Sequence, residues 1–352
     1  MDINIRLKRV TIKEKALFTR AFAAMIGAGL PLVRALTILK QQTNNKYFAG
    51  ILSDVIRRVE EGENLSGSLS HYPKAFENVY VKSIKAAEAS GKLEEILDSL
   101  AEQLEKEYKL SSSIKNAVAY PIFIVVMMII AAIILLLVVV PKLQSAFAEA
   151  SVKLPLTTRI LIGTTNGIIN YWYLILLVII AAVISVRYYL KTENGQLVYG
   201  RMLISLPIIR ELYVNVYMAR FTRTFAMLSS AGVPIMETVK IVGGVVSNKV
   251  YEKILAGAAR QLERGVALSS PISQAKEFPP LVSQMMAVGE QTGKIDEVML
   301  TLADFFDEEA EKRVGIVTSL LEPILLVIVG VGVGTIVFSI VVPIYQIAQM
   351  VR

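Results

Sequence analysis

One stretch of the chain has residue types that suit phosphate binding: GEQTGKIDEV, residues 289 to 298. A phosphate-binding loop needs Gly, four residues, Gly, Lys and then Ser or Thr. Its backbone N–H groups surround the phosphates and its hydroxyl reaches Mg²⁺. Here three residues separate Gly289 from Gly293, and Ile295 stands where the hydroxyl residue should be. The spacing therefore argues against a nucleotide site.

Other residues that carry chemistry are scarce. The chain has no Cys and a single His, His71, in the loop-like sequence SLSHYPKAF. Nucleophile–base pairs of the Ser–His or Cys–His type have almost no residues to build from. We therefore predict no catalytic residue, no cofactor or cofactor-binding residue, and no enzyme activity.

Carboxylates gather in two clusters, one after Lys92 and one after Lys294. They are Glu94, Glu95, Asp98 and Glu102 in the first cluster, and Asp296, Glu297, Asp304, Asp307 and Glu308 in the second. Spacings of three and four residues place carboxylates on one helix face, where a hard cation such as Ca²⁺ can bind. A solvated face or a surface for a basic partner has the same spacing. We predict no metal site, although the spacing alone leaves a divalent cation open.

An internal repeat explains the 289–298 stretch. FTRAFAAMIGAGLPLVRALTIL at 18–39 and FTRTFAMLSSAGVPIMETVKIV at 221–242 share nine of 22 residues at an offset of 203. EASGKL at 88–93 matches EQTGKI at 290–295 at an offset of 202. The first copy therefore has one extra residue, which we place near His71. Because Ala87 stands opposite Gly289, that glycine is not part of the repeated pattern.

The repeated blocks predict helix–helix turns. In E-x-x-G-K the glycine takes the left-handed conformation that ends one helix, and the lysine and acidic residues after it open the next. In A-G-[LV]-P the glycine ends a helix and the proline occupies the first helical position. The predicted structural turn residues are Gly29, Pro31, Gly91 and Lys92 in the first copy, and Gly232, Pro234, Gly293 and Lys294 in the second. Thr11 and Glu14 have the spacing of a capping box for the first helix.

Three apolar runs raise the hydrophobic content to 54% and the mean hydropathy to +0.54. They lie between Pro121 and Pro141, from Tyr171 to Val186, and between Pro323 and Pro343; the first and third contain 19 uncharged residues each. A helix of that length rises about 28 Å, close to the ~30 Å hydrocarbon core of a bilayer. We therefore predict three transmembrane helices.

Basic residues next to the spans predict their orientation. An excess of Lys and Arg marks the cytoplasmic side of a membrane protein. On the side of the N-terminus these residues are Lys106, Lys109, Lys115, Arg187, Lys191, Lys312 and Arg313. The N-terminus is therefore predicted to be cytoplasmic. Residues of this kind account for much of the net charge of +7, so we predict no nucleic-acid partner.

The predicted fold is an all-α membrane protein with two repeated cytoplasmic helical bundles, of about six helices each, and three transmembrane helices. The bundles cover residues 1–117 and 190–319. The transmembrane helices cover 118–140, 171–189 and 320–342. A short periplasmic segment covers 141–170, and a periplasmic tail covers 343–352.

The third apolar run contains two features with functional interest. Glu322 lies at its cytoplasmic mouth, where the first copy has Tyr120. A carboxylate costs about 2.5–3.5 kcal/mol at the membrane centre and less near an interface. We expect an interfacial or interhelical hydrogen bond there, with a proton relay as the alternative. Gly330 and Gly334 form G-x-x-x-G, which suits helix packing within the chain, between protomers or against another subunit.

Together these motifs resemble the inner-membrane platform proteins of type IV pilus and type II secretion machines, the PilC/GspF family. The resemblance covers nearly the whole chain. It rests on the two duplicated blocks and on the pairs Tyr120-Pro121 and Glu322-Pro323 at the starts of the first and third apolar runs.

The resemblance implies a multi-pass protein of the bacterial inner membrane that couples a hexameric cytoplasmic ATPase to the insertion of pilin or pseudopilin subunits into a fibre. It also implies contacts with other inner-membrane assembly proteins and a homo-oligomer, dimeric or higher. The alternative function is a small membrane transporter or channel subunit, with Glu322 and the glycines along its path. Against it, the apolar runs contain few polar residues.

Overall fold

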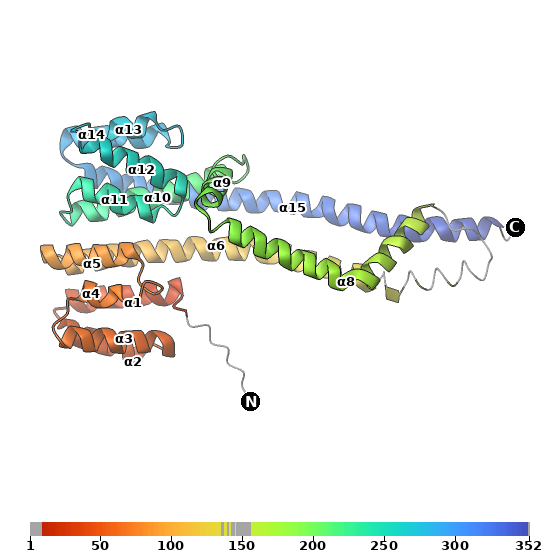
Figure 1. Cartoon of the computed structure of the whole chain (residues 1–352), viewed down its shortest axis with the longest axis horizontal. Helices are drawn as coiled ribbons and strands as arrows, with labels where there is room; N and C mark the ends of the chain where they lie inside the picture. Colours follow the sequence, from red (N-terminus) through yellow and green to blue (C-terminus); the bar gives the residue numbers. More distant parts are fainter. Residues whose placement is uncertain (1–8, 135–136, 139–140, 142–144, 146–155, 351–352) are drawn as a thin grey trace. The chain divides into compact units, whose positions relative to one another are not determined.

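The computed structural model describes residues 9–134, 137–138, 141, 145 and 156–350, and these residues form helices and turns but no strand (Figure 1). They divide into two compact units. The first unit contains Met1–Ser113 and Gln196–Arg313, and the second contains Ile114–Gly195 and Val314–Arg352. The chain is therefore all-α, as predicted, and both repeat copies belong to the first unit.

The first copy consists of five helices and the beginning of a sixth (red to yellow in Figure 1). They are α1 (Ile12–Gly27), α2 (Leu32–Gln42), α3 (Lys46–Glu60), α4 (Leu65–Ser70), α5 (Asn78–Ser90) and α6 (Leu93–Ile134). Thr11 and Glu14 form the predicted capping box at the start of α1. Buried aromatic rings hold these helices together, with Phe18 near Phe22, Phe48 and Phe76 at centroid distances of 5.2–6.0 Å.

The second copy repeats this order (green to blue in Figure 1). After α9 (Glu193–Leu203) come α10 (Arg210–Ser230), α11 (Ile235–Val245), α12 (Lys249–Leu262), α13 (Ser269–Gln274), α14 (Pro280–Thr292) and α15 (Ile295–Met350). Phe221 packs edge-on against Phe278 at 5.5 Å, which matches the contact between Phe18 and Phe76. The second core is therefore built from equivalent residues of the repeat.

Glycines end the helices of both copies at equivalent turns. Gly91 and Gly293 follow α5 and α14 with φ of +70° and +71°, the left-handed region that only glycine enters without strain. Gly29 and Gly232 have φ of +79° and +82°. A further equivalent pair, Gly62 and Gly265, has φ of +96° and +81° and was not recognised in the sequence.

Gly289, the first glycine of the stretch that resembles a phosphate loop, has a packing role. A Cβ atom added to it would lie 2.8 Å from the Cα of Ile295, at the start of α15. Its carbonyl accepts the N–H of Lys294 at 3.1 Å, which closes the turn. The stretch is therefore a helix–helix turn with a close backbone approach.

One boundary differs from the prediction by a residue. Pro31 and Pro234 were expected at the first helical position, but they are the N-caps of α2 and α11. Their ψ angles, 140° and 137°, are extended, and the Pro31 carbonyl already accepts the N–H of Ala35 at 3.0 Å. An N-cap residue has non-helical dihedral angles although its carbonyl already accepts the first hydrogen bond of the helix. Pro31 and Pro234 fit this definition, so the helices begin one residue later.

The second unit contains the remainder of α6, α8 (Leu156–Tyr189) and the remainder of α15. Among the described residues, α6 and α15 are long and apolar enough to cross a membrane. Almost none of their most apolar stretches is buried within the chain, which fits side chains that face lipid. The chain therefore has two apolar helices that fit a membrane protein.

The third predicted span corresponds to part of α8. Its apolar stretch, Leu176–Tyr189, is shorter than the other two. At Tyr171, where the span was predicted to begin, the backbone departs from helical geometry with φ −118° and ψ 16°. The number of spans stays a prediction, and residues 135–136, 139–140, 142–144 and 146–155 of the first span and the periplasmic segment lie outside the described residues. The helix α15 continues through Pro343 to Met350, so its end does not mark the end of a span.

The left-handed turns make a stability prediction. Gly91→Ala should lower the free energy of unfolding of the full-length protein by about 1–2 kcal/mol, because an L-residue is strained at this φ. No atom lies within 4 Å of the added Cβ, so the cost is purely conformational. Denaturation in detergent, followed by circular dichroism, measures it. Gly50→Ala in the open surface of α3 is the control and should be stabilising by about 0.5–1 kcal/mol. A neutral Gly91→Ala would contradict the assignment.

Candidate functional site

The glutamate of each E-x-x-G-K block binds the start of a short helix. Glu88 of α5 accepts the backbone N–H of Leu65 at 2.6 Å and of Ser66 at 3.3 Å, as well as the Ser66 hydroxyl. These N–H groups have no partner within α4, and the positive end of a helix favours a carboxylate. Glu88 therefore fixes α4 against α5.

Glu290 makes the same contacts in the second copy. It accepts the N–H of Leu268 at 2.6 Å and of Ser269 at 3.3 Å, together with the Ser269 hydroxyl. Leu65 and Leu268 are 203 residues apart, whereas Glu88 and Glu290 are 202 apart. The extra residue of the first copy therefore lies between the short helix and α5, in agreement with the predicted position near His71.

The lysines of the two turns have different surroundings. Lys92 lies 3.4 Å from Glu95 and donates to the carbonyl oxygen of Ser230 in the second copy at 3.3 Å. Lys294 donates within its own copy, to Glu297 at 3.1 Å. Both are about half exposed, so neither lysine forms a closed anion site.

Replacing the capping glutamates tests this part of the site. Glu88→Gln and Glu290→Gln should each lower the free energy of unfolding by about 1.5–3 kcal/mol, the usual contribution of hydrogen bonds to a charged group. The measurement is denaturation of the full-length protein in detergent. Glu263→Gln, which loses only an exposed pair with Lys240, should have a much smaller effect. Equal losses for the three variants would contradict the capping role.

The arginine of each F-T-R block pairs with carboxylates of the long helix of its copy. In the first copy Arg20 binds both oxygens of Glu105 at 2.8 Å and also contacts Asp98. This hydrogen bond lowers the pKa of Glu105 below its usual value. The Arg20 side chain is 38% exposed, so water competes for these contacts.

The equivalent arginine of the second copy is buried and joins the two copies. The Arg223 side chain, 6% exposed, donates to Asp304 at 2.7 Å and to Asp307 at 2.8 Å, both in its own copy. It also donates to Glu102 of α6 in the first copy at 3.1 Å. Lys106 of α6 binds the same Asp304 oxygen as Arg223, at 2.6 Å. These five residues are called the Arg223 cluster below.

Charge neutralisation stabilises the ionised forms within the Arg223 cluster. Burial alone raises the pKa of Asp304, but the hydrogen bonds from Lys106 and Arg223 outweigh it and hold the pKa below the usual value. Burial lowers the pKa of Lys106, and hydrogen bonds to Asp304 and Glu102 outweigh it, so that this pKa is raised. Each partner therefore keeps the others charged.

Further ion pairs follow the same line between α6 and the second copy. Arg220 contacts Glu107, and Lys109 binds Glu311 at 2.8 Å. Lys109 and Glu311 are equivalent positions of the repeat, 202 residues apart. Six of the nine acidic residues that the sequence left open as a cation site pair with Arg or Lys: Glu95, Asp98, Glu102, Glu297, Asp304 and Asp307. Within the described residues no group of His, Asp or Glu side chains has the geometry of a metal site.

The two arginines provide a matched pair of variants. Arg223→Ala leaves three carboxylates with Lys106 alone, and should lower the free energy of unfolding by about 2–3 kcal/mol. This is less than the 3–5 kcal/mol typical of a fully buried pair, because the carboxylates are 26–53% exposed. Arg20→Ala breaks an exposed pair and should cost about 1 kcal/mol or less. Denaturation in detergent measures both, and a larger effect for Arg20 would contradict the burial argument.

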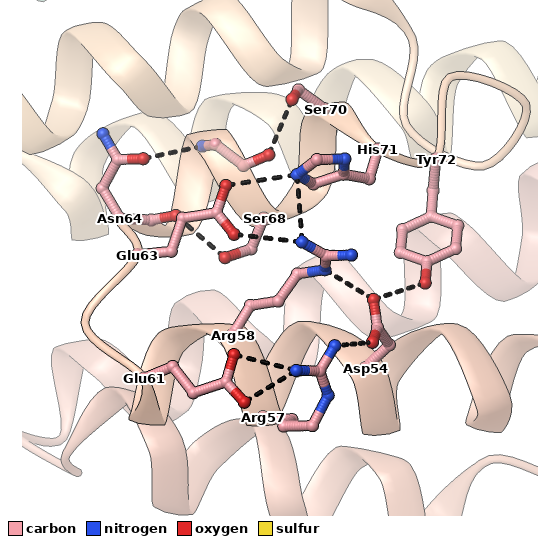
Figure 2. A network of polar contacts seen from close by, with 11 residues as sticks. Asp54, Arg57, Arg58, Glu61, Glu63, Asn64, Ser68, Ser70, His71 and Tyr72 are labelled. Atoms are coloured by element: carbon pink, nitrogen blue, oxygen red, sulfur yellow. Dashed lines mark hydrogen bonds and ion pairs between the residues drawn. The ribbon is translucent and has the colours of Figure 1, made fainter.

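A second polar network occurs on α3 and α4 of the first copy only (Figure 2). Asp54 accepts from Arg57, Arg58 and the hydroxyl of Tyr72, each at 2.6 Å. Hydrogen bonds from Tyr72 first, then Arg58 and Arg57, hold the pKa of Asp54 well below its usual range. His71, the single His, lies 3.3 Å from Arg58 in the same network.

This network has no counterpart in the second copy. The positions of Asp54, Arg58 and Glu61 are occupied there by Gly257, Gln261 and Arg264. Glu61 binds Arg57 at 2.7 Å, and Glu63 lies 3.3 Å from His71. The network therefore fastens α3 to α4 and to the turn that holds the extra residue. It gives the first copy a surface that the second lacks.

The predicted residues of the third apolar run lie apart from these clusters. Glu322 is exposed on α15. A Cβ added to Gly330 or Gly334 would meet no atom within 4 Å, whereas one on Gly332 would lie 3.4 Å from the Met128 sulfur of α6. Gly332 is therefore the glycine that approaches another helix of the chain. Packing through Gly330 and Gly334 stays a prediction.

The two repeat copies of this chain match a known protein family. The family model for "Type II secretion system (T2SS), protein F" matches the chain twice, at residues 18–141 and 221–343. These matches are the two repeat copies, each with its following apolar helix. The chain belongs to the type II secretion system protein F family.

Similar proteins carry names from pilus assembly and secretion. The type IV pilus assembly protein PilC of Thermus thermophilus is 37% identical over 96% of this chain and 83% of its own length. The corresponding PilC of Myxococcus xanthus is 32% identical over 97% and 82%. The type II secretion system protein F of Aeromonas hydrophila is 34% identical over 96% and 87%. These names denote assembly proteins and confirm the family that the repeated motifs indicated.

Proposed function

We propose that the chain is the inner-membrane platform of a type IV pilus or type II secretion machine. In this role it couples a cytoplasmic assembly ATPase to the insertion of pilin or pseudopilin subunits into a fibre. The relatives' names supply the two machines. The observation that carries the proposal is the family match in both copies, each ending in an apolar helix with exposed side chains.

The arrangement of the chain supports a mechanical role. In each copy the left-handed glycine and the carboxylate that caps a short helix fix the point where the long helix begins. In the proposed function, α6 and α15 then lead from the two bundles into the membrane, where pilin-like subunits contact them. The bundles lie in the cytoplasm with the N-terminus, as the flanking Lys and Arg residues predict.

The fixed relation between the copies also supports this proposal. The Arg223 cluster and the pairs Arg220–Glu107 and Lys109–Glu311 link α6 to α10 and α15. A displacement of one bundle by an ATPase would therefore reach the helix of the other. The network on α3 and α4 gives the first copy a distinct polar surface for such a partner.

Purification of the tagged full-length protein from native membranes tests the proposal. A lysine-reactive crosslinker should join residues 1–115 or 190–315 to a hexameric secretion-type ATPase. p-Benzoylphenylalanine in place of Phe123 or Phe338, exposed by 60% and 70% in α6 and α15, should crosslink to pilin-like subunits. Mass spectrometry identifies both products.

The control is an unrelated tagged membrane protein purified from the same cells. Recovery of the pilin-like subunits without the ATPase would contradict coupling. Recovery of neither, in membranes that contain the assembled machine, would contradict the platform role and favour the transporter alternative.

A further inference from the structure

The two copies contact each other through different faces. α5 of the first copy lies between α4 and the helices α10 and α11 of the second copy (Figure 1). α14, the equivalent of α5, makes no comparable contact with α1 or α2 among the described helices. If the two copies were related by a two-fold axis, α5 would contact α10 and α11 and α14 would contact α1 and α2. A head-to-tail relation between the copies produces only one of these two contacts. Each copy therefore keeps one face of this interface uncovered.

The uncovered face of the first copy is called the α1–α2 face and contains Leu17, Ala24 and Ala28. The equivalents of Ala24 and Ala28 in the second copy are buried inside the chain, and the equivalent of Leu17 is the partly exposed Arg220. Met227 and Ala231, each 4% exposed, belong to the hydrophobic core of the first copy. Their equivalents Ala24 and Ala28 are exposed. The same position of the repeat is thus covered in one copy and open in the other.

The uncovered face of the second copy is called the α14–α15 face and contains Val288 and Phe305. The equivalent of Val288 in the first copy is Ala86, which packs against the core. The equivalent of Phe305 is Gln103, which lines one pocket with Arg220. Val288 is 47% exposed and Phe305 is 46% exposed. Exposed apolar side chains of this kind are candidates for an interaction surface.

Two polar residues that line one pocket between the copies have apolar equivalents at the uncovered faces. Inside the chain, Gln103 and Arg220 are polar, and Arg220 pairs with Glu107. At the equivalent positions stand Phe305 and Leu17, and Leu17 is 63% exposed. If two protomers met at these faces as the two copies meet within the chain, Phe305 of one protomer would lie near Leu17 of the other.

Size and charge also match at the uncovered faces. Val288 is larger than its equivalent Ala86, and Ala24 is smaller than its equivalent Met227, so the two uncovered faces differ from the internal pair in opposite senses. The internal ion pair between Arg223 and Glu102 has its equivalents in Arg20 and Asp304. Both already have partners within the chain, Arg20 in Glu105 and Asp304 in Arg223 and Lys106, but at 38% and 53% exposure they carry opposite charges that remain accessible to a further partner.

We propose that the α14–α15 face of one protomer binds the α1–α2 face of a second copy of this chain. The contact repeats the docking of α5 and α6 on α10 and α11 within the chain. It is head-to-tail, so each dimer keeps one free face of each kind and can add further protomers in a ring or a row. This proposal does not depend on the proposed function in pilus assembly or secretion.

Cysteine crosslinking tests the proposal directly, because the natural chain has no Cys. Leu17→Cys and Phe305→Cys are placed in separate copies with different tags, and both are expressed in the same cells. Mild oxidation of native membranes should give a heterodimer that contains both tags and only traces of dimers with one tag. The double variant should give a ladder of dimer, trimer and higher species on a non-reducing gel.

Two controls fix the interpretation. Gln103→Cys with Arg220→Cys should crosslink within one chain and give no ladder. Ser53→Cys, exposed on α3 outside the α1–α2 face, should not crosslink with Phe305→Cys. Crosslinks of Leu17→Cys to itself with none to Phe305→Cys would overturn the head-to-tail contact. The absence of any crosslinked species would overturn self-association through these faces.

Charge substitutions give a second, independent readout. Phe305→Glu should weaken self-association in mild detergent by at least about tenfold in dissociation constant, measured by light scattering after size exclusion. Mixing it with Leu17→Lys should restore the heterodimer through opposite charges. Unchanged thermal unfolding of each variant shows that folding is intact. Full association of Phe305→Glu alone would overturn the proposal.

Discussion

The buried guanidinium of Arg223 is the constraint on which the relation between the two copies depends. With 6% of its side chain exposed, this cation cannot be solvated by water and must be neutralised by carboxylates. Its own copy supplies Asp304 and Asp307, and Glu102 comes from the other copy. Three carboxylates around one arginine would repel one another, and Lys106 offsets this. The second copy supplies two of these carboxylates, and α6 of the first copy adds Glu102 and Lys106, so the cluster ties the two copies together.

The directions of the long helices depend on two local devices that act together. The left-handed glycine after α5 or α14 reverses the chain, and the glutamate one turn earlier holds the short helix beside it. The glutamate lies three residues before the glycine, in the last turn of α5 or α14. Its hydrogen bonds to N–H groups more than 20 residues away explain why glutamate, glycine and lysine recur together in both copies.

Local features of this fold were predictable from the sequence, and the partners of its charges were not. Glycine turns, the capping box and the apolar helices follow from neighbouring residues, so the repeat was sufficient to place them. The helix start after Pro31 was wrong by one residue, because cap and first helical position differ only in ψ. The arginines of the two F-T-R blocks look identical in sequence. Only tertiary packing leaves Arg20 on the surface and buries Arg223 against residues about 80 to 120 positions away.

The two copies have kept their internal contacts and diverged where they meet. Equivalent aromatic residues build both cores, and equivalent glutamates cap both short helices. In contrast, Arg220 and Met227 in the internal interface correspond to Leu17 and Ala24 on the surface. In a duplicated domain with one face covered inside the chain, the equivalent face of the other copy is open to another molecule. This arrangement gives the protomer a direction, since its first and second copies present different surfaces to whatever binds next. In the proposed function, such a direction would distinguish the side that receives movement from a cytoplasmic partner from the side that passes it on.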